Sequence, residues 1–383
     1  VLPQKKQPEL FPVLLSCAEK DWEELRLLLL RKNRDWKGVE KLSTNALCAR
    51  DPVTVSEFFN RRMNGFLKEV LLETEDGPLG FIDHHYWRLE YQARGAPHIH
   101  MKLWSKEAPV LGEEGVTDAM VLEYILKHVT CAIPSLQENK ELYEKVLKFQ
   151  VHKCTASCLR VRKSKGKVSK YCRYGFPRAV QPSASLNGLA ETVKANAKKT
   201  GSKKLYNLRR SEAEVRVNDY NPVILMGWNG NVDVQFVGEK KMILNKYITG
   251  YITKGEKNET QGIWSAMEQD KSVAARLKKL MYACNRTREV GTYEIADDLL
   301  GHPLHGSSDP VEWLGVGMPG KRFRALKKAT ELQGAEDGCW FQDNLIETYY
   351  PNRHDDLEGA SLYEIAGEWR VEKVADPKTE KEK

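Results

Sequence analysis

The pattern of apolar and polar residues divides the chain into segments with different predicted structures. Residues 11–16 (FPVLLS) form an apolar run before a Trp- and Leu-rich segment, which is typical of a buried strand followed by a helix. Asp51 and Pro52 then open residues 51–73, where apolar residues recur at helical spacing and Pro suits the first turn. We expect an amphipathic helix here, its apolar face formed by Phe59, Met63, Phe66, Leu67 and Val70.

Two strand-like stretches follow, residues 81–92 (FIDHHYWRLEYQ) and 97–104 (PHIHMKLW), on either side of ARGA (93–96). This layout predicts a β-hairpin with a Gly-containing loop. Adjacent residues of a strand face opposite ways, so at most one of His84 and His85 could contribute to a site on either face.

The rest of the chain alternates between regular and irregular patterns. Residues 116–150 have a helical pattern, whereas residues 150–215 are basic, rich in Ser and Gly, and predicted to be irregular. Residues 231–237 (NVDVQFV) alternate like a strand, and residues 240–254 (KKMILNKYITGYITK) follow them.

Composition places the chain among folded proteins. It has 383 residues, of which 41% are hydrophobic, enough for a buried core and more than one domain. No apolar run has the length of a membrane span, and the polar start VLPQKKQPEL has neither a signal-peptide core nor an initiator Met. We therefore expect a fragment of something longer.

Positive charge is concentrated in the middle of the chain. The formal net charge is +7, but residues 151–220 alone carry 17 Lys and Arg against 4 Asp and Glu. Residues 160–170 and 198–210 are typical of phosphate-contacting or nuclear-targeting stretches, although two solvated loops would have the same composition. The predicted DNA-contacting side chains are Lys163, Lys165, Lys167, Arg173, Lys203, Lys204, Arg209 and Arg210.

Four potential metal ligands lie within this basic segment. His152, Cys154, Cys158 and Cys172 follow the spacing H-x-C-x3-C-x13-C. Four N and S ligands in a stretch too polar for a core of its own favour a closed, structural Zn²⁺ site. The spacing is not that of a standard zinc finger, so reduced thiols without a metal are the alternative. Clustered cysteines without a secretion signal also indicate a reducing compartment.

The second strand of the predicted hairpin carries a histidine–hydrophobe–histidine triplet. Because side chains alternate along a strand, His98 and His100 point the same way. Glu90 and Gln92 share a parity on the partner strand, so the hairpin can bring one of them beside the histidines. A carboxylate with two imidazoles suits Mg²⁺ or Mn²⁺ bridging a phosphate, and such a set also accepts Zn²⁺. A pair of surface histidines without a ligand is the alternative.

Two tyrosines form a second candidate group. Tyr247 and Tyr251 lie four residues apart, and Lys254 lies three residues further on. On a helix all three share a face, and on a strand both tyrosines still would. A tyrosine can attack phosphorus and keep a DNA end as a covalent ester, and a nearby cation, the metal or Lys246 and Lys254, would favour its phenolate. A tyrosine–aliphatic packing face is the alternative.

Several of these motifs together resemble a known family. The stretches EYQARGAPHIHMKLW (90–104), CRYGFPR (172–178) and YITGYITKGE (247–256) resemble the replication-initiator endonuclease domain of Helitron transposons, which belongs to the histidine–hydrophobe–histidine (HUH) nuclease superfamily. Further similarity covers residues 11–25, 51–59 and 285–314, so the resemblance extends over most of the chain.

The resemblance implies an α+β fold in which a central antiparallel sheet carries the histidine hairpin, with flanking helices and a tyrosine helix alongside. It also implies Mg²⁺- or Mn²⁺-dependent, rolling-circle nicking and joining of single-stranded DNA at transposon ends, in the nucleus, through a 5′-phosphotyrosine and a free 3′-hydroxyl. His98 and His100 would be metal ligands, with Glu90, or alternatively Gln92, as the third. Tyr247 and Tyr251 would be the two candidate nucleophiles.

The expected domain organisation follows from the same resemblance. The nuclease core would comprise residues 1–148 and 221–256, with a basic zinc-binding insertion at 149–220 and a helical accessory region and tail at 257–383. Family members also carry a C-terminal helicase. This chain has no phosphate-binding G-x-x-x-x-G-K-[ST] loop. Either the helicase is a further part of a longer protein or it has been lost, and the missing initiator Met favours the first.

Two other functions fit parts of the sequence. One is a domesticated, catalytically inactive DNA-binding module that uses the basic segment and the zinc group. The other is a zinc hydrolase that activates water at Glu90, His98 and His100, which leaves the tyrosine pair unexplained.

Overall fold

A computed structural model describes residues 10–72, 76–91, 95–110, 113–164, 167–187, 205–237, 291–308, 326–328, 330 and 340–369. The chain divides into two compact units, residues 6–308 and residues 309–383 together with 1–5, and each is described by itself. The finer boundaries expected at residues 148, 220 and 256 stay predictions.

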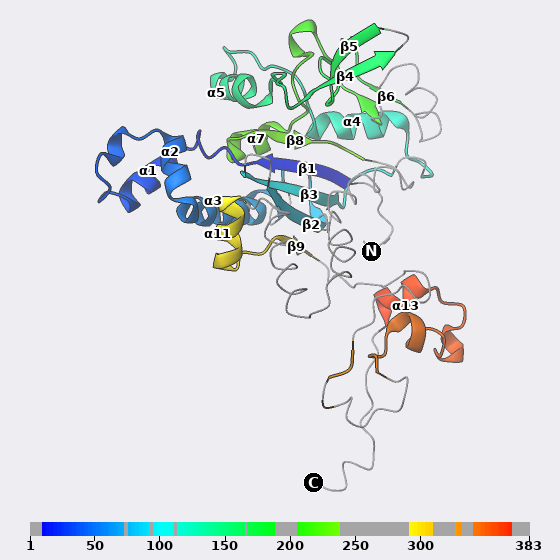
Figure 1. Cartoon of the computed structure of the whole chain (residues 1–383). Coiled ribbons are helices and arrows are strands. Elements are labelled where there is room, and N and C mark those ends of the chain that lie inside the picture. Colours follow the sequence, from blue (N-terminus) through cyan, green and yellow to red (C-terminus); the bar gives the residue numbers. More distant parts are fainter. Residues whose placement is uncertain are drawn as a thin grey trace. The chain divides into compact units, whose positions relative to one another are not determined.

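Figure 1 shows the helices and strands of the first unit; its 3₁₀ and π turns are given the symbol η. Its elements are β1 (Leu10–Ser16), α1 (Glu23–Lys32), η1 (Val39–Lys41), α2 (Thr44–Arg50), α3 (Pro52–Phe66), η2 (Leu67–Leu72), β2 (Ile82–Tyr91), β3 (Pro97–Ser105), α4 (Asp118–His128), α5 (Lys140–Lys145), η3 (Val146–Gln150), β4 (Leu159–Ser164), β5 (Lys167–Cys172), β6 (Ser185–Leu186), β7 (Tyr206–Asn207), η4 (Glu212–Glu214), α7 (Pro222–Trp228), β8 (Val232–Val234), α11 (Thr292–Leu300) and β9 (His305–Ser307).

In the second unit the described residues include η5 (Leu345–Tyr349), η6 (Asp355–Leu357) and α13 (Leu362–Glu368). A capping box begins α13, because the Ser361 hydroxyl accepts from the Glu364 amide and the Glu364 carboxylate accepts from the Ser361 amide. No helix among the residues described in either unit is long and apolar enough to span a membrane.

An antiparallel sheet in the order β8-β1-β3-β2-β9 forms the centre of the first unit. The predicted α+β architecture with a central antiparallel sheet is therefore confirmed. The strand expected at 11–16 is β1, and the expected hairpin is β2 and β3. Gly95 in its connection has a φ of 82°, a left-handed conformation that favours glycine.

The register gives this sheet two unlike faces. On the apolar face, Val13 of β1 lies beside Met101 of β3, and Leu15 lies beside Ile99; all four side chains are at most 2% exposed. The opposite face carries polar or charged side chains of three strands, namely Ser16, Arg88, Glu90, His98, His100 and Lys102. One face therefore builds the core, and the other gathers the polar side chains.

Helices bury the apolar face. The Asp51 side chain accepts from the Thr54 amide and caps α3, whose Phe59 and Phe66 are buried as the helical spacing predicted. Both rings meet the indole of Trp228 from α7, with centroids 5.9 and 5.5 Å away. Trp22 meets the same indole at 5.6 Å. Aromatic contacts between α3, α7 and the segment after β1 thus hold one contiguous core together.

The prediction of an irregular segment at residues 150–215 is wrong for part of its length. Strands β4 and β5 form an antiparallel hairpin, with Leu159 opposite Cys172 and Ser164 opposite Lys167. Exposed side chains such as Val161 and Val168 lie on it, so burial imposes no alternation of apolar and polar residues that could mark the strands in the sequence.

Candidate metal centres and nucleic-acid interface

The hairpin brings three of the predicted ligands together. In the β2–β3 register Glu90 lies directly opposite His98, and Arg88 lies opposite His100. The Glu90 Oε2 atom lies 2.9 Å from Nε2 of His100, and the two imidazole rings have centroids 5.0 Å apart. Strand parity and cross-strand pairing therefore place one carboxylate and two imidazoles on the same patch of the polar face.

Ser16 orients the more buried imidazole. His98 is 6% exposed, and its Nδ1 atom lies 3.0 Å from the Ser16 hydroxyl, which is directly opposite on β1. The Asn231 side chain donates to the same hydroxyl over 3.3 Å. A partner on one ring nitrogen fixes the orientation of the ring, as the outer partners of metal-binding histidines do. The sequence did not reveal this role, because β1 and β3 are more than eighty residues apart.

A buried cation lies further along the same face. Lys102 of β3 is 0% exposed, and burial lowers the pKa of its ammonium group to about 8. It lies opposite Tyr86 of β2, whose pKa is raised chiefly by burial. The parity that Lys102 shares with His98 and His100 could have placed it on their face from the sequence alone. Its burial could not have been predicted, because a lysine on a strand is ordinarily solvent-exposed.

The donor set fits a hard or borderline divalent cation. One carboxylate and two imidazoles on a rigid sheet leave coordination positions for water or a phosphate oxygen, the arrangement that Mg²⁺, Mn²⁺ or a catalytic Zn²⁺ uses. His84 shares their face but lies six residues before Glu90, about 20 Å along the strand, and pairs with Asp83 at 3.4 Å. His85 has the opposite parity.

The remaining predicted members of this site lie outside the described residues. They are Gln92, Tyr247, Tyr251 and Lys254. Glu90 is accordingly the carboxylate whose contact with the histidines can be described.

The second candidate metal centre contains all four of its predicted ligands. The ligand atoms of His152, Cys154, Cys158 and Cys172 all lie within 4.8 Å of one another, and Cys172 Sγ lies 3.3 Å from His152 Nε2. Cys158 and Cys172 are buried, at 2% and 6% exposed. Three thiols and an imidazole at these separations can hold a metal such as zinc. Four such ligands fit a closed structural site.

Local interactions favour the metal-binding forms of two of these ligands. Burial opposes ionisation of Cys172, but the backbone amides of Phe176 and Tyr174 outweigh it and lower the pKa of the thiol. Burial, followed by the charges of Arg216 and Arg178, lowers the pKa of His152. A thiol that ionises readily and an imidazole that stays neutral are what a cation needs.

The predicted DNA-contacting residues divide into groups. Arg173 is exposed and lies over the ring of Tyr174, 4.6 Å from its centroid. Arg209 is exposed as well. Lys163 and Lys167 lie at the turn end of β4 and β5. Lys165, Lys203 and Lys204 lie outside the described residues.

Arg210 is placed in the interior. It is 4% exposed and pairs with Asp219 at 2.9 Å, while its guanidinium also donates to the Val217 carbonyl over 2.7 Å. Arg178 pairs with the same carboxylate. The charge of Arg210 therefore stabilises the fold within residues 210–219, because a buried charge needs such partners.

A buried polar network joins α11 to the core. The carboxylate of Asp297, 2% exposed, accepts from Tyr91 over 2.5 Å and from Ser56, and lies 2.8 Å from His302 Nδ1. Burial, then the charge of Asp297, raises the pKa of Tyr91. His302 and Ser56 both approach Oδ1 of Asp297, so the three side chains do not form a proton relay. Because Ser56 lies on α3 and Tyr91 on β2, the network docks α11 onto these two elements.

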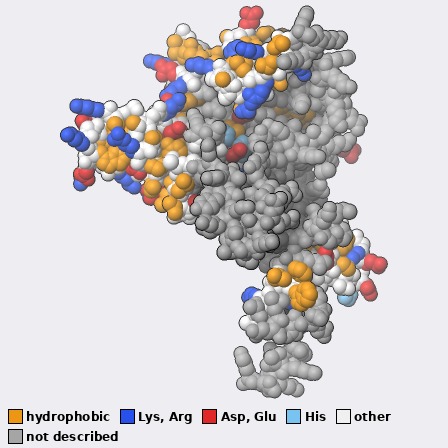
Figure 2. Space-filling view, in the orientation of Figure 1, with side chains coloured by type: hydrophobic (Ala, Val, Ile, Leu, Met, Phe, Trp, Pro, Cys, Tyr) orange, Lys and Arg blue, Asp and Glu red, His pale blue; other side chains and the backbone are white. Residues whose placement is uncertain are grey.

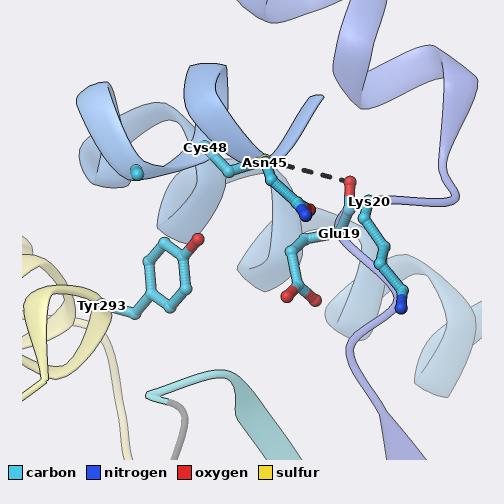
Figure 3. Close-up of a pocket in the computed structure, with 6 residues that line it drawn as sticks. Glu19, Lys20, Asn45, Cys48 and Tyr293 are labelled. Atoms are coloured by element: carbon cyan, nitrogen blue, oxygen red, sulfur yellow. Dashed lines mark hydrogen bonds between the residues drawn. The ribbon is translucent and has the colours of Figure 1, made fainter. Parts of the chain in front are cut away.

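A cavity of about 290 Å³ (Figure 3) is lined by Glu19, Lys20, Asn45, Cys48, Ala49 and Tyr293. Cys48 bonds to the Glu19 carbonyl, and burial, followed by the charge of Glu19, raises the pKa of its thiol to about 12. A thiol held in its neutral form is a poor nucleophile, so the cavity offers no reactive cysteine.

One comparison with known proteins gives a match. Residues 2–103 match the family model described as the Helitron helicase-like domain at the N-terminus. The match includes β1, β2 and the histidines of β3, and it relates this part of the chain to Helitron proteins. Among curated proteins nothing matches the chain.

Proposed function

We propose, from the Helitron relationship of residues 2–103 and the geometry of their hairpin, that the chain is a metal-dependent HUH endonuclease and transesterase for single-stranded DNA. The observation that supports this most is the contact of Glu90 with His100 beside His98 on a polar sheet face. Such a site would initiate rolling-circle transposition by nicking a transposon end.

The residues would divide the chemistry as follows. Glu90, His98 and His100 would hold Mg²⁺ or Mn²⁺, which polarises the scissile phosphate and stabilises developing charge. The phenolic oxygen of Tyr247 or Tyr251 would attack phosphorus as it loses its proton, aided by Lys254. The bond from phosphorus to the 3′ oxygen breaks, and that oxygen takes up a proton. Attack by a 3′-hydroxyl on the phosphotyrosine reverses these events and joins strands.

The rest of the proposal concerns partners and location. Zn²⁺ held by the second centre would brace the basic segment, whose exposed Lys and Arg contact the DNA backbone without reading sequence. Such a protein acts in the nucleus, alongside the helicase domain of the full-length transposase.

The test is a nicking assay with a matched histidine control. We expect the wild-type chain, given Mn²⁺ and randomised, end-labelled single-stranded oligonucleotides, to form a covalent protein–DNA adduct. His98→Ala should abolish the adduct, whereas His84→Ala, on the same sheet face but far along the strand, should retain it. Cleavage that leaves two free DNA ends would instead indicate water attack at a zinc hydrolase. DNA binding without cleavage by the wild type would indicate the inactive module.

A further inference from the structure

The second candidate metal centre (His152, Cys154, Cys158 and Cys172), called the zinc group below, lies at the base of the β4–β5 hairpin. Cys158 immediately precedes β4, and Cys172 ends β5 opposite Leu159. We refer to residues 159–172 as the ribbon. Among the described residues, Cys158, Cys172 and Phe176 form a small buried apolar cluster at this base, with Cys154 and Leu159 packed against them. The metal centre thus fixes the base of the ribbon and leaves its strands exposed.

The register gives the ribbon two chemically different faces. On one face Arg160 lies opposite Tyr171, and Arg162 lies opposite Ser169. The other face carries Val161 opposite Lys170. We refer to the first as the arginine–tyrosine face. It contains aromatic, cationic and hydroxyl groups, whereas the other combines exposed valines with a lysine.

Arginine and tyrosine side chains stack on each other on and beside this face. Arg162 lies 5.9 Å from the ring centroid of Tyr171, which is 50% exposed, although a tyrosine usually buries most of its ring. Just beyond the ribbon, Arg173 stacks on Tyr174, which is 53% exposed. The Tyr174 ring also contacts the zinc ligand His152, with centroids 5.8 Å apart. The metal centre therefore also positions the second pair.

The sequence around the ribbon lacks acidic residues. No Asp or Glu lies between Glu144 and Glu191 in the sequence. Figure 2 shows Lys and Arg side chains interleaved with hydrophobic ones over the region where Figure 1 places β4 and β5. A polyanion is the complementary ligand, and exposed rings beside cations are the groups on which unpaired bases stack.

We infer that the arginine–tyrosine face of the ribbon is a binding surface for single-stranded DNA, with Arg162 and Arg173 on phosphates and Tyr171 and Tyr174 stacking on unpaired bases. This inference rests on the proposed function for its choice of ligand. It adds a DNA-binding site separate from the metal centre of the β2–β3 hairpin. This site would prefer unpaired over paired DNA strands. Arg160 braces the strand, because its guanidinium donates to the Ser157 and Leu159 carbonyls.

The experiment measures equilibrium binding of a fluorescein-labelled, mixed-sequence 20-nucleotide DNA to the whole chain, by anisotropy, with zinc bound and no Mg²⁺ or Mn²⁺ added. Tyr171→Ala should weaken binding about 5- to 50-fold, whereas Tyr171→Phe should retain it, because stacking uses the ring. Arg162→Glu should weaken binding at least about 10-fold and reduce its salt dependence.

Lys170→Glu is the matched control, since it makes the same charge reversal on the other face of the same ribbon. It should weaken binding several-fold less than Arg162→Glu does. Equal losses would overturn the assignment of a face and indicate a diffuse basic surface. A loss by Tyr171→Ala that is as large on duplex DNA, or no loss on single strands, would also overturn the inference. Zinc content and thermal melting of each variant establish that the ribbon is intact.

The two proposals can fail separately. His98→Ala should keep Tyr171-dependent binding, because the ribbon does not contain that histidine. If the wild type binds single strands through Tyr171 but never nicks, the ribbon inference stands and the nuclease proposal falls. If it nicks, and Tyr171→Ala changes neither binding nor nicking, the ribbon inference falls alone.

Discussion

The two candidate metal centres differ in what holds their ligands in place. Glu90, His98 and His100 lie on a sheet whose other face is buried in the large core of the first unit, so their positions depend on hydrophobic packing. The second centre, His152, Cys154, Cys158 and Cys172, belongs to a small cluster in which, among the described residues, Cys158, Cys172 and Phe176 are the buried ones. We therefore expect its geometry to depend on a bound metal, since so small a cluster cannot offset the entropy of ordering its loops.

This difference suits the two roles that we propose. A catalytic cation must be exchangeable and correctly oriented before substrate arrives, which a rigid sheet provides. A structural cation closes a loop-rich segment and can be fully surrounded by protein ligands. Substitutions that change each centre separately test this difference.

The largest expected effect is that of His100→Ala. Loss of this ligand should reduce the rate of Mn²⁺-dependent adduct formation by more than about 100-fold, because the cation loses an imidazole and Glu90 loses its contact. Zinc content and DNA affinity should stay at wild-type values. Initial rates on denaturing gels measure the effect, and a variant that keeps a third of the wild-type rate would contradict it.

The next effect is that of Cys158→Ser. The variant should lose its zinc, and the ribbon should become a protease-sensitive segment, cleaved about 10-fold faster or more. The main thermal transition of the sheet and helices should remain. Metal analysis and timed proteolysis with mass mapping give the result. Full zinc occupancy and unchanged cleavage would remove the structural-zinc proposal.

Asp297→Ala should act on the core instead. The substitution leaves Tyr91, Ser56 and His302 without their buried acceptor, so the free energy of unfolding should fall by about 2–4 kcal/mol. Zinc content should not change. Chemical denaturation measures the loss, and Asp298→Ala, one residue along the same helix, is the control. Equal stability of the two variants would argue against the docking role of the network.

Ser16→Ala should have the smallest effect. It removes the hydroxyl that holds His98 Nδ1, so affinity for Mn²⁺ should fall about 10-fold while the metal site persists. Titration calorimetry with Mn²⁺ compares the variant with wild type. Unchanged affinity would show that the strands alone orient His98.

Local sequence patterns were sufficient to predict the helices and strands that bury one face in the core. Strand parity and the spacing of a short hairpin predicted that His98, His100 and either Glu90 or Gln92 share a face, and the register places Glu90 there. The grouping of His152, Cys154, Cys158 and Cys172 was also predicted from spacing, because all four lie within one short segment.

Features that depend on distant pairing or on burial could not be read from the sequence. Ser16 meets His98 only through the β1–β3 pairing. Arg210 has the composition of a DNA-contacting residue, yet Asp219 holds it in the interior. The sequence of the ribbon has no alternation of apolar and polar residues that would predict its strands, because Val161 and Val168 are exposed like their neighbours.

The most direct test of the central claim is to map the covalent adduct. After reaction with Mn²⁺ and single-stranded DNA, the protein is digested and the peptide that carries the nucleotide is identified by mass spectrometry. The account predicts a nucleotide on Tyr247 or Tyr251, and no adduct in Glu90→Gln or in the double variant Tyr247→Phe/Tyr251→Phe. Wild-type cleavage by that double variant, with free DNA ends, would contradict it.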